Sequence, residues 1–318
     1  MNKKALHLAL RLTAYLLFAA VFIYILMNHG HDIQNALSKI EYKWLLILVP
    51  LQFAMIAISG FAFKILSLPF DFKLKWHDWM GLSFIANFMN QLLPYRPGFA
   101  FRYLYLKQNY NMPLNIYLWI MTAYLAITCF IAACFCLLGW LFGKLYIIDG
   151  RQILLVLILC SGLILFGYFL KKSSNTQVAT GFDSLFTALK KMIHAPGILS
   201  ISSMSFIISY LIITLLFYSI FISLHHPIAF THCMFLTGII TVASIVPITA
   251  ANIGVNESLM GVLTQLLYQD FSLGFSATLI YRMSQWIPAF IFGTLFSFYL
   301  VGNIFPWRTK HMQDITKP

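Results

Sequence analysis

Residues 232–270 read HCMFLTGIITVASIVPITAANIGVNESLMGVLTQLLYQD, and Glu257 lies near the middle of this apolar stretch. A carboxylate at membrane depth costs about 2.5–3.5 kcal/mol on insertion scales, so it is usually paired, hydrated or functional. The apolar run before it ends near Pro247, a loop with Gly254 follows, and the run 258–268 is about half a span long at ~1.5 Å per residue. The pattern predicts two half-helices that meet at mid-depth, an arrangement that holds the substrate in transporters.

A purely local role for Glu257 stays open. In this interpretation Asn256 is the N-cap of the second half-helix, and Glu257 is a first-turn acid that the helix dipole stabilises by about 0.3–1 kcal/mol. The local and functional roles are compatible, because a capping acid can also line a cavity.

The composition indicates a polytopic membrane protein. Of 318 residues, 60% are hydrophobic and only 9% are charged, whereas soluble domains average about 25% charged residues. The net charge of +12 comes from residues dispersed between apolar runs, without the clustered basic face that nucleic acids require. The five cysteines lie inside apolar runs with no metal-ligand set nearby. We therefore expect neither a nucleic-acid partner nor a metal or cofactor.

The fold class that we predict is an all-α membrane domain spanning residues 1–318, with six full transmembrane helices and two re-entrant hairpins of opposite orientation. The spans are expected at 12–30, 44–63, 114–143, 153–170, 198–224 and 271–307, the last interrupted only by Arg282. The hairpins are expected at about 79–107 and 231–268, where proline and glycine break the apolar sequence. We expect the first span to be retained, since no small-x-small cleavage site follows Met27.

The distribution of lysine and arginine favours the re-entrant topology. With both termini cytoplasmic, it places 16 basic residues inside and 4 outside the cytoplasmic (inner) membrane, with Arg282 within it. One full crossing in the first broken region and two in the second would instead place 8 inside and 12 outside. The segment 171–197 then becomes a cytoplasmic linker. Its apolar residues have helical spacing, which fits either a helix on the membrane surface or a solvated linker helix.

The first broken region, residues 87–107, reads NFMNQLLPYRPGFAFRYLYLK. Asn87, Asn90 and Gln91 are spaced i, i+3, i+4, so they share one face of a helix. A proline, an irregular stretch with glycine and a charged residue follow, as in the second region. The first region supplies arginine and the second supplies glutamate. Such paired interruptions in the two halves of a chain indicate the binding site of an inverted-repeat transporter.

At these residues the chain resembles the transmembrane (flippase) region of lysylphosphatidylglycerol synthases and its stand-alone relatives. An asparagine-rich helix runs into L-P-x-x-x-G with a later arginine, then come a proline and G-x-x-E, and a late span carries tyrosine, arginine and glycine. The matching residues are Asn87, Asn90, Leu93, Pro94, Gly98, Arg102, Pro247, Gly254, Glu257, Tyr281, Arg282 and Gly293. The resemblance covers nearly the whole chain in length and order.

Two departures separate this chain from many relatives. Phe99 stands where they carry a glutamate after the first motif's glycine, and the loop before Glu257 has fewer glycines. No soluble aminoacyl-transfer domain follows, so synthase activity is not implied. The resemblance implies movement of a phospholipid or a polyprenyl-linked lipid across the cytoplasmic membrane, with envelope-synthesis enzymes as partners.

The leading hypothesis is therefore a lipid translocase, not an enzyme, with a polar cavity between the hairpins. Arg96 and Arg102 would hold a phosphate, since guanidinium binds phosphate through two hydrogen bonds. Glu257 and Arg282 would form a charge pair or a proton-linked gate, or a purely structural pair. The remaining candidate substrate-binding residues are Asn87, Asn90, Gln91, Gly98, Asn252, Gly254 and Asn256.

Two other functions compete with this one. A membrane-embedded transferase acting on a lipid carrier would need a base near a cleft. The candidates are His194, His225, His226 and His232, all of them near predicted interfaces. A small-solute transporter is the other alternative, although no motif in the sequence favours a soluble substrate.

Overall fold

The computed structural model describes residues 42–92, 96–145, 195–245 and 252–304. All regular structure in these ranges is helical. The predicted spans 12–30 and 153–170, most of the linker 171–197, and Pro94 and Pro247 lie outside the described residues.

Four long helices form the frame of the molecule. They are α2 (Leu45–Ser67), α5 (Leu114–Gly143), α8 (Pro196–Ser223) and α11 (Phe271–Ile304), and the single turns η1 (Tyr42–Trp44) and η2 (Leu68–Phe70) flank α2. Three described helices, α2 with η2, α5 and α8, are long and apolar enough to cross a membrane. The fourth, α11, has 34 residues and so extends over about 51 Å. Long helices thus occur at the four predicted spans that fall within the described residues.

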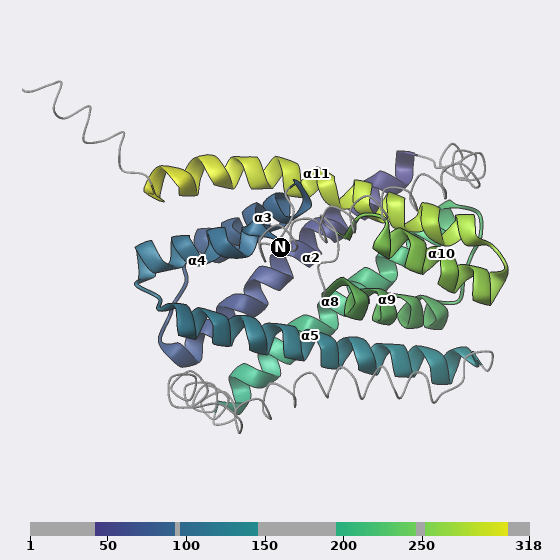
Figure 1. The fold of residues 1–318 in the computed structure, drawn as a ribbon, viewed down its shortest axis with the longest axis horizontal. Coiled ribbons are helices and arrows are strands. Elements are labelled where there is room, and N and C mark those ends of the chain that lie inside the picture. Colours follow the sequence, from purple (N-terminus) through teal and green to yellow (C-terminus); the bar gives the residue numbers. More distant parts are fainter. Residues whose placement is uncertain (1–41, 93–95, 146–194, 246–251, 305–318) are drawn as a thin grey trace, which may run out of the picture.

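Two pairs of shorter helices flank the two predicted breaks. We call α3 (Trp76–Leu92) with α4 (Pro97–Tyr110) the first hairpin, and α9 (Phe230–Ile245) with α10 (Val255–Tyr268) the second hairpin. Their helices have 14 to 17 residues, or about 21–26 Å, which is less than the ~30 Å of a bilayer core. Figure 1 shows the two hairpins at opposite ends of the molecule.

Backbone chemistry fixes where these short helices begin and end. Pro97 occupies the first turn of α4, where its missing N–H is not needed. Arg96 before it and Asn111 after α4 both take left-handed conformations, with φ of 51° each. Gly254 precedes α10 with φ of 78°, a conformation that costs glycine little because it has no Cβ.

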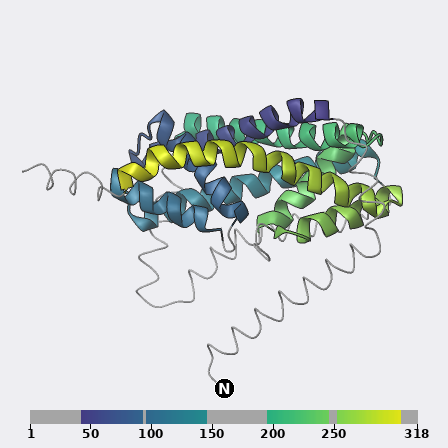
Figure 2. The same ribbon diagram turned by 90° about the horizontal axis from the view of Figure 1, so that it is seen from above.

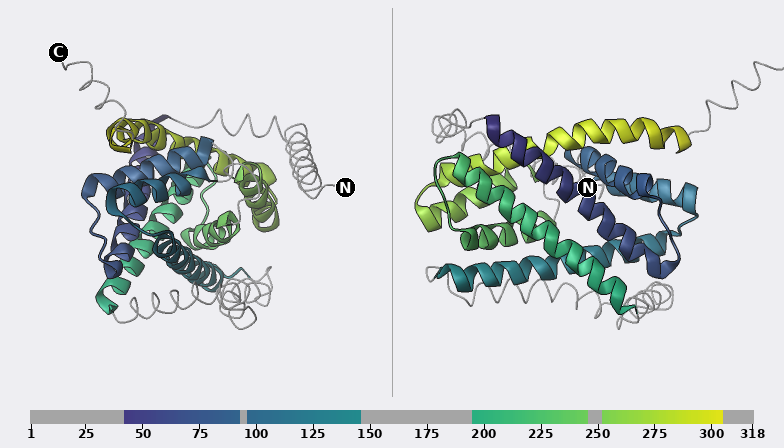
Figure 3. Two further views of the ribbon diagram at one scale, coloured as in Figure 1. Left: turned by 60° about the vertical axis from the view of Figure 1, so that its left-hand side comes forward. Right: turned by 180° about the vertical axis from the view of Figure 1, so that it is seen from behind.

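The long helices pack against the hairpins and against one another. α11 packs against α10 near its start and against α3 further along, α5 packs against α9, and α2 packs against α8. The last pair runs along the face opposite that of Figure 1 (Figure 3, right), and both hairpins lie on the other side (Figure 2).

Each hairpin has its own hydrophobic core. One cluster contains Leu82 and Ile85 of α3 with Tyr105 and Leu106 of α4. Another contains buried residues of α9, α10 and the start of α11. The breaks between α3 and α4 and between α9 and α10 lie in the region between the two cores.

Candidate functional site

A polar cavity of about 370 Å³ lies between the two hairpins, a volume within the usual range of ligand sites, roughly 300–1,000 Å³. Its walls come from all four long helices, from all four hairpin helices and from residues at both breaks. Eight of the residues predicted from the sequence line it: Asn87, Asn90, Gln91, Arg96, Arg102, Asn252, Asn256 and Arg282. Thus residues from both halves of the sequence converge on one cavity.

The amide side chains of α3 form one wall, on the shared face that their spacing predicts. Gln91 Nε2 donates to Asn87 Oδ1 at 2.5 Å, and Gln285 Nε2 of α11 reaches the same oxygen at 3.5 Å. Asn90 Oδ1 accepts the backbone N–H of Gly98 at 2.9 Å. Asn90 therefore satisfies one of the free donors at the start of α4.

Gly98 does not line the cavity, contrary to its predicted place among the substrate-binding residues. A Cβ at this position would lie 2.2 Å from the carbonyl oxygen of Ala86 and 2.6 Å from the Cα of Ala86. Glycine is needed because the backbones of α3 and α4 are in direct contact. The sequence motif therefore marks a packing requirement here.

Arg102 is buried, with 7% of its surface exposed, and lines the cavity. Its Nη2 donates to Ser83 Oγ at 3.3 Å, and its guanidinium carbon lies 4.8 Å from the centroid of the Phe63 ring. Among the described residues its Nε has no hydrogen-bond partner, and no carboxylate lies within ion-pair distance of it. A buried cation thus faces the cavity without a counter-charge in this part of the chain.

Arg96 links the two hairpins across the cavity. Its Nη2 donates to the backbone carbonyl of Ser244, which lies in the last turn of α9, and Asn252 Nδ2 donates to the same oxygen at 3.0 Å. Carbonyls at a helix C-terminus have no partner within the helix, and a positive charge there is favourable. At least one donor of the Arg96 guanidinium is therefore used to bind the end of α9 in the second hairpin.

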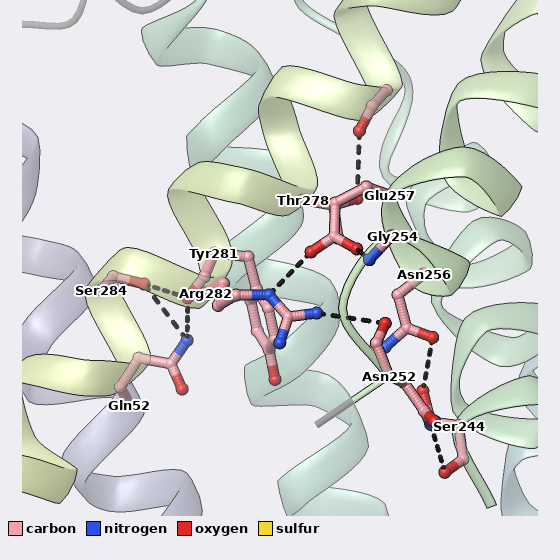
Figure 4. A network of polar contacts seen from close by, with 11 residues as sticks. Gln52, Ser244, Asn252, Gly254, Asn256, Glu257, Thr278, Tyr281, Arg282 and Ser284 are labelled. Atoms are coloured by element: carbon pink, nitrogen blue, oxygen red, sulfur yellow. Dashed lines mark hydrogen bonds and ion pairs between the residues drawn. The ribbon is translucent and has the colours of Figure 1, made fainter. Parts of the chain in front are cut away.

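Glu257 and Arg282 form the predicted ion pair (Figure 4). Arg282 Nε lies 2.7 Å from Glu257 Oε1, and Glu257 Oε2 accepts the backbone N–H of Gly254 at 2.6 Å. Arg282 Nη2 also reaches the carbonyl oxygen of Asn252 at 3.4 Å. Glu257 is fully buried and does not line the cavity. Both carboxylate oxygens of Glu257 therefore accept hydrogen bonds from within the protein.

The proposed N-cap of α10 needs correction. The N-cap is Gly254, not Asn256, because the left-handed conformation before the helix favours glycine. Gly254 does not line the cavity, contrary to its predicted place among the substrate-binding residues. Glu257 occupies the N3 position and accepts the N–H of the N-cap, while Asn256 Oδ1 accepts the hydroxyl of Ser244 at 3.2 Å. The local and paired roles of Glu257 are thus realised together.

Several polar cavity residues were not singled out from the sequence, among them Ser83, Ser244 and Gln285. Ser83 lies four residues before Asn87, and Gln285 lies three residues after Arg282, so each extends a polar helical face. That periodicity could have identified them. Nothing in the local sequence distinguishes Ser244, whose part depends on Arg96, 148 positions away.

Of the histidines proposed for a transferase, the three that the structure describes, His225, His226 and His232, do not line the cavity. His232 Nε2 lies 3.0 Å from the carbonyl oxygen of Gly143, and its Nδ1 contacts the hydroxyl of Tyr268. His225 and His226 lie in the turn after α8, and His194 is outside the described residues. In the described part of the chain no cluster of three His, Cys, Asp or Glu residues could hold a metal.

Of three comparisons with known proteins, one gives a match. No curated protein matches the chain, and no solved structure does. The family model described as the lysylphosphatidylglycerol synthase TM region matches residues 10–293. This range contains both hairpins and every cavity residue named above. The chain therefore belongs to the family of the lysylphosphatidylglycerol synthase transmembrane region.

Proposed function

We propose that this protein moves an anionic lipid, either a phospholipid or a polyprenyl-linked lipid, between the leaflets of the cytoplasmic membrane during envelope biogenesis. The headgroup enters the cavity between the hairpins, and the acyl or prenyl chains stay in the bilayer. The lipid is translocated without chemical change. Membership of the family and the polar cavity between two broken helices support this function.

The environment of Arg102 is the observation that carries the proposal. Removing a cation from water costs several kcal/mol unless an opposite charge compensates it. The described residues offer Arg102 only a hydroxyl and an aromatic ring. A lipid phosphate in the cavity would supply the missing charge, and guanidinium can bind it through two parallel hydrogen bonds.

The two hairpins have different parts in this proposal. The first hairpin supplies the binding groups, Arg102 with the amides of Asn87 and Gln91. The Glu257–Arg282 pair is a positioning element, because it fixes the start of α10 and is satisfied without a ligand. Arg96 joins the hairpins at Ser244, so breaking this contact would separate the two cavity walls. The charge distribution along the sequence favours hairpins that enter from opposite faces of the membrane.

Lipid movement in liposomes tests the proposal. Protein is reconstituted with phosphatidylglycerol that is fluorescently labelled on an acyl chain, and dithionite reports the outer leaflet, with and without a proton gradient. Arg102→Ala should slow translocation by about 30-fold or more, since losing one partner of a buried charge pair costs at least ~2 kcal/mol. Arg102→Lys should restore it only in part, because an ammonium cannot make the two parallel bonds.

Lys107→Ala is the matched control, since Lys107 is an exposed cation on the same helix. This variant should translocate at the parental rate. The melting temperature and membrane abundance of each variant are measured in parallel. Parental translocation by a stable Arg102→Ala variant would overturn the proposal.

A further inference from the structure

The first hairpin is fastened at its base, the end away from its break. Asp78, near the start of α3, accepts the hydroxyl of Tyr105 at 2.6 Å and also that of Tyr110, the last residue of α4. Beside it, the ring of His77 lies 5.4 Å from the ring of Tyr299 on α11, measured between centroids. These contacts hold α3 and α4 together and join their base to a long helix.

The base of the second hairpin is fastened in the same way. His232, near the start of α9, contacts the hydroxyl of Tyr268, the last residue of α10. Its Nε2 lies 3.0 Å from the carbonyl oxygen of Gly143 at the end of α5. The two bases lie at opposite ends of the molecule (Figure 1). Because both hairpins are held at these outer ends, a tilt of either one would displace mainly its inner end beside the break, which we call the tip.

The contact between Arg96 and Ser244 joins the two tips across the cavity, and we call it the latch. The described helices of one hairpin make few direct contacts with those of the other, but Arg96 Nη2 donates to the backbone carbonyl of Ser244. Asn252 Nδ2 donates to the same oxygen at 3.0 Å. Opening the latch therefore leaves this carbonyl with a partner, which avoids the cost of an unpaired acceptor.

The backbone of Arg96 favours release of the latch. Its φ of 51° and ψ of 55° lie in the left-handed region, which is unfavourable for a residue with a Cβ. Pro97 follows, and the residue before a proline prefers an extended conformation. The local sequence thus disfavours the latched conformation, and the contact with Ser244 helps to hold it.

A phosphate in the cavity would be a stronger partner for Arg96 than the carbonyl is. Arg96 lines the cavity and is only half-buried, so a headgroup can reach it. A carbonyl oxygen carries a partial charge, whereas a phosphate carries a full negative charge and fits a guanidinium through two parallel hydrogen bonds. Arg102 lines the same cavity, so a phosphate that binds it brings the competing charge into the space that Arg96 borders.

We propose that the ligand opens the latch: the lipid phosphate draws Arg96 away from Ser244, the tips separate, and the headgroup passes between them. This inference rests on the proposed function and deepens it, since Arg96 couples binding of the headgroup to movement of the hairpins. Arg102 binds the phosphate throughout. Arg96 binds Ser244 before the phosphate arrives and the phosphate afterwards.

Spin-label distances measure whether a phosphate opens the tips. In a background whose five native cysteines are replaced by alanine, exposed positions are labelled in two pairs. The pairs are Ala100→Cys with Ile253→Cys at the tips and, as the matched control, Gln108→Cys with Leu266→Cys at the bases. In liposomes of digalactosyldiacylglycerol, which has no phosphate, added phosphatidylglycerol should lengthen the tip distance by about 5 Å, one helical turn, and leave the base distance unchanged. With Arg96→Met, the tip distance should be long even without phosphatidylglycerol.

A covalent tie tests whether the tips must separate for transport. The variant Arg96→Cys, Ser244→Cys in the same background is treated with a bis-maleimide about as long as an arginine side chain. The comparison is the same variant treated with N-ethylmaleimide, which modifies the cysteines without joining them. Joined tips should move labelled phosphatidylglycerol at least about tenfold more slowly, because alternating access requires one half to move against the other. His232→Cys with Tyr268→Cys is the matched control at a base, where joining should not change the rate.

The outcomes separate this inference from the proposed function. Equal rates for joined and unjoined tips would overturn the inference alone, as would a tip distance that does not respond to phosphatidylglycerol. An Arg96→Met variant whose tips stay close and still separate on addition of phosphatidylglycerol would also overturn it. If no lipid moves, or if Arg102→Ala translocates at the parental rate, the proposed function fails and the inference falls with it.

Discussion

The two hairpins have the same architecture but treat their buried charges in opposite ways. In the second hairpin, Glu257 is fully buried and bonded to Arg282 and to the backbone of Gly254. In the first hairpin, Arg102 is almost as buried, yet the described residues give it no carboxylate. Within the described residues, the charge of the second hairpin has a counter-charge, whereas the buried cation of the first hairpin has no carboxylate beside it.

This difference separates scaffold from binding surface. A buried pair stabilises the structure only when its geometry is good and its remaining polar atoms are satisfied, and the Glu257–Arg282 pair meets both conditions at Glu257. A buried cation without a counter-charge, such as Arg102, does not stabilise the fold in this way, so we look for another reason for its presence. We attribute that reason to ligand binding, which makes the first hairpin the functional one and the second its support.

The sharpest test of the comparison is Glu257→Gln, which has the largest expected effect. The change keeps the side-chain shape but leaves Arg282 without its counter-charge, and it should lower stability by about 3–5 kcal/mol. The melting temperature and the yield of monodisperse protein in detergent measure this. In the first hairpin, Arg102→Gln should leave the melting temperature unchanged or raise it, because no partner loses its charge.

The double variant Glu257→Gln, Arg282→Gln separates structure from function in the second hairpin. Removing both charges together should recover most of the stability, since neither charge is then left unpaired. A scaffold role predicts that translocation recovers with stability. A stable but inactive double variant, together with pH-dependent transport by the parent protein, would contradict that role and assign Glu257 to proton coupling.

The contact between α3 and α4 predicts a smaller loss. Gly98→Ala would place a methyl group against the backbone of Ala86, so the hairpin must open, at a cost of about 1–3 kcal/mol. Gly197→Ala is the control, because a Cβ there meets no atom within 4 Å, and alanine is the better helix former. A melting temperature for Gly98→Ala as high as that of Gly197→Ala would show that the two helices are not in direct backbone contact.

The smallest expected effect concerns the cap within the first hairpin. Asn90 accepts the N–H of Gly98, so Asn90→Ala should lose about 1 kcal/mol. Asn90→Asp keeps an acceptor and adds a negative charge that is favourable at a helix N-terminus. Its melting temperature should therefore stay closer to that of the parent. If Asn90→Asp and Asn90→Ala lose the same amount, Asn90 does not act as an acceptor here.

Several features of the site could be predicted because they depend on local sequence. The spacing of Asn87, Asn90 and Gln91 placed them on one helical face, and all three line the cavity. The presence of Glu257 and Arg282 within apolar sequence indicated their pairing, which the structure confirms. Gly98 and Gly254 were predicted to bind substrate because they belong to the motifs that resemble the family pattern. In the structure, close packing against Ala86 explains Gly98, and a positive φ explains Gly254.

The sequence by itself determined the helical membrane class, the positions of the long helices that the structure describes and the two breaks. These follow from apolar run length, from proline and glycine, and from the high cost of a charge in lipid. Only the tertiary structure decided which charge is satisfied, because that depends on contacts between distant residues. Arg96 meets Ser244 across 148 positions, and the cavity forms only where the hairpin helices and the long helices come together. Local periodicity carries no information about such contacts, since they arise when separate helices pack their side chains against one another.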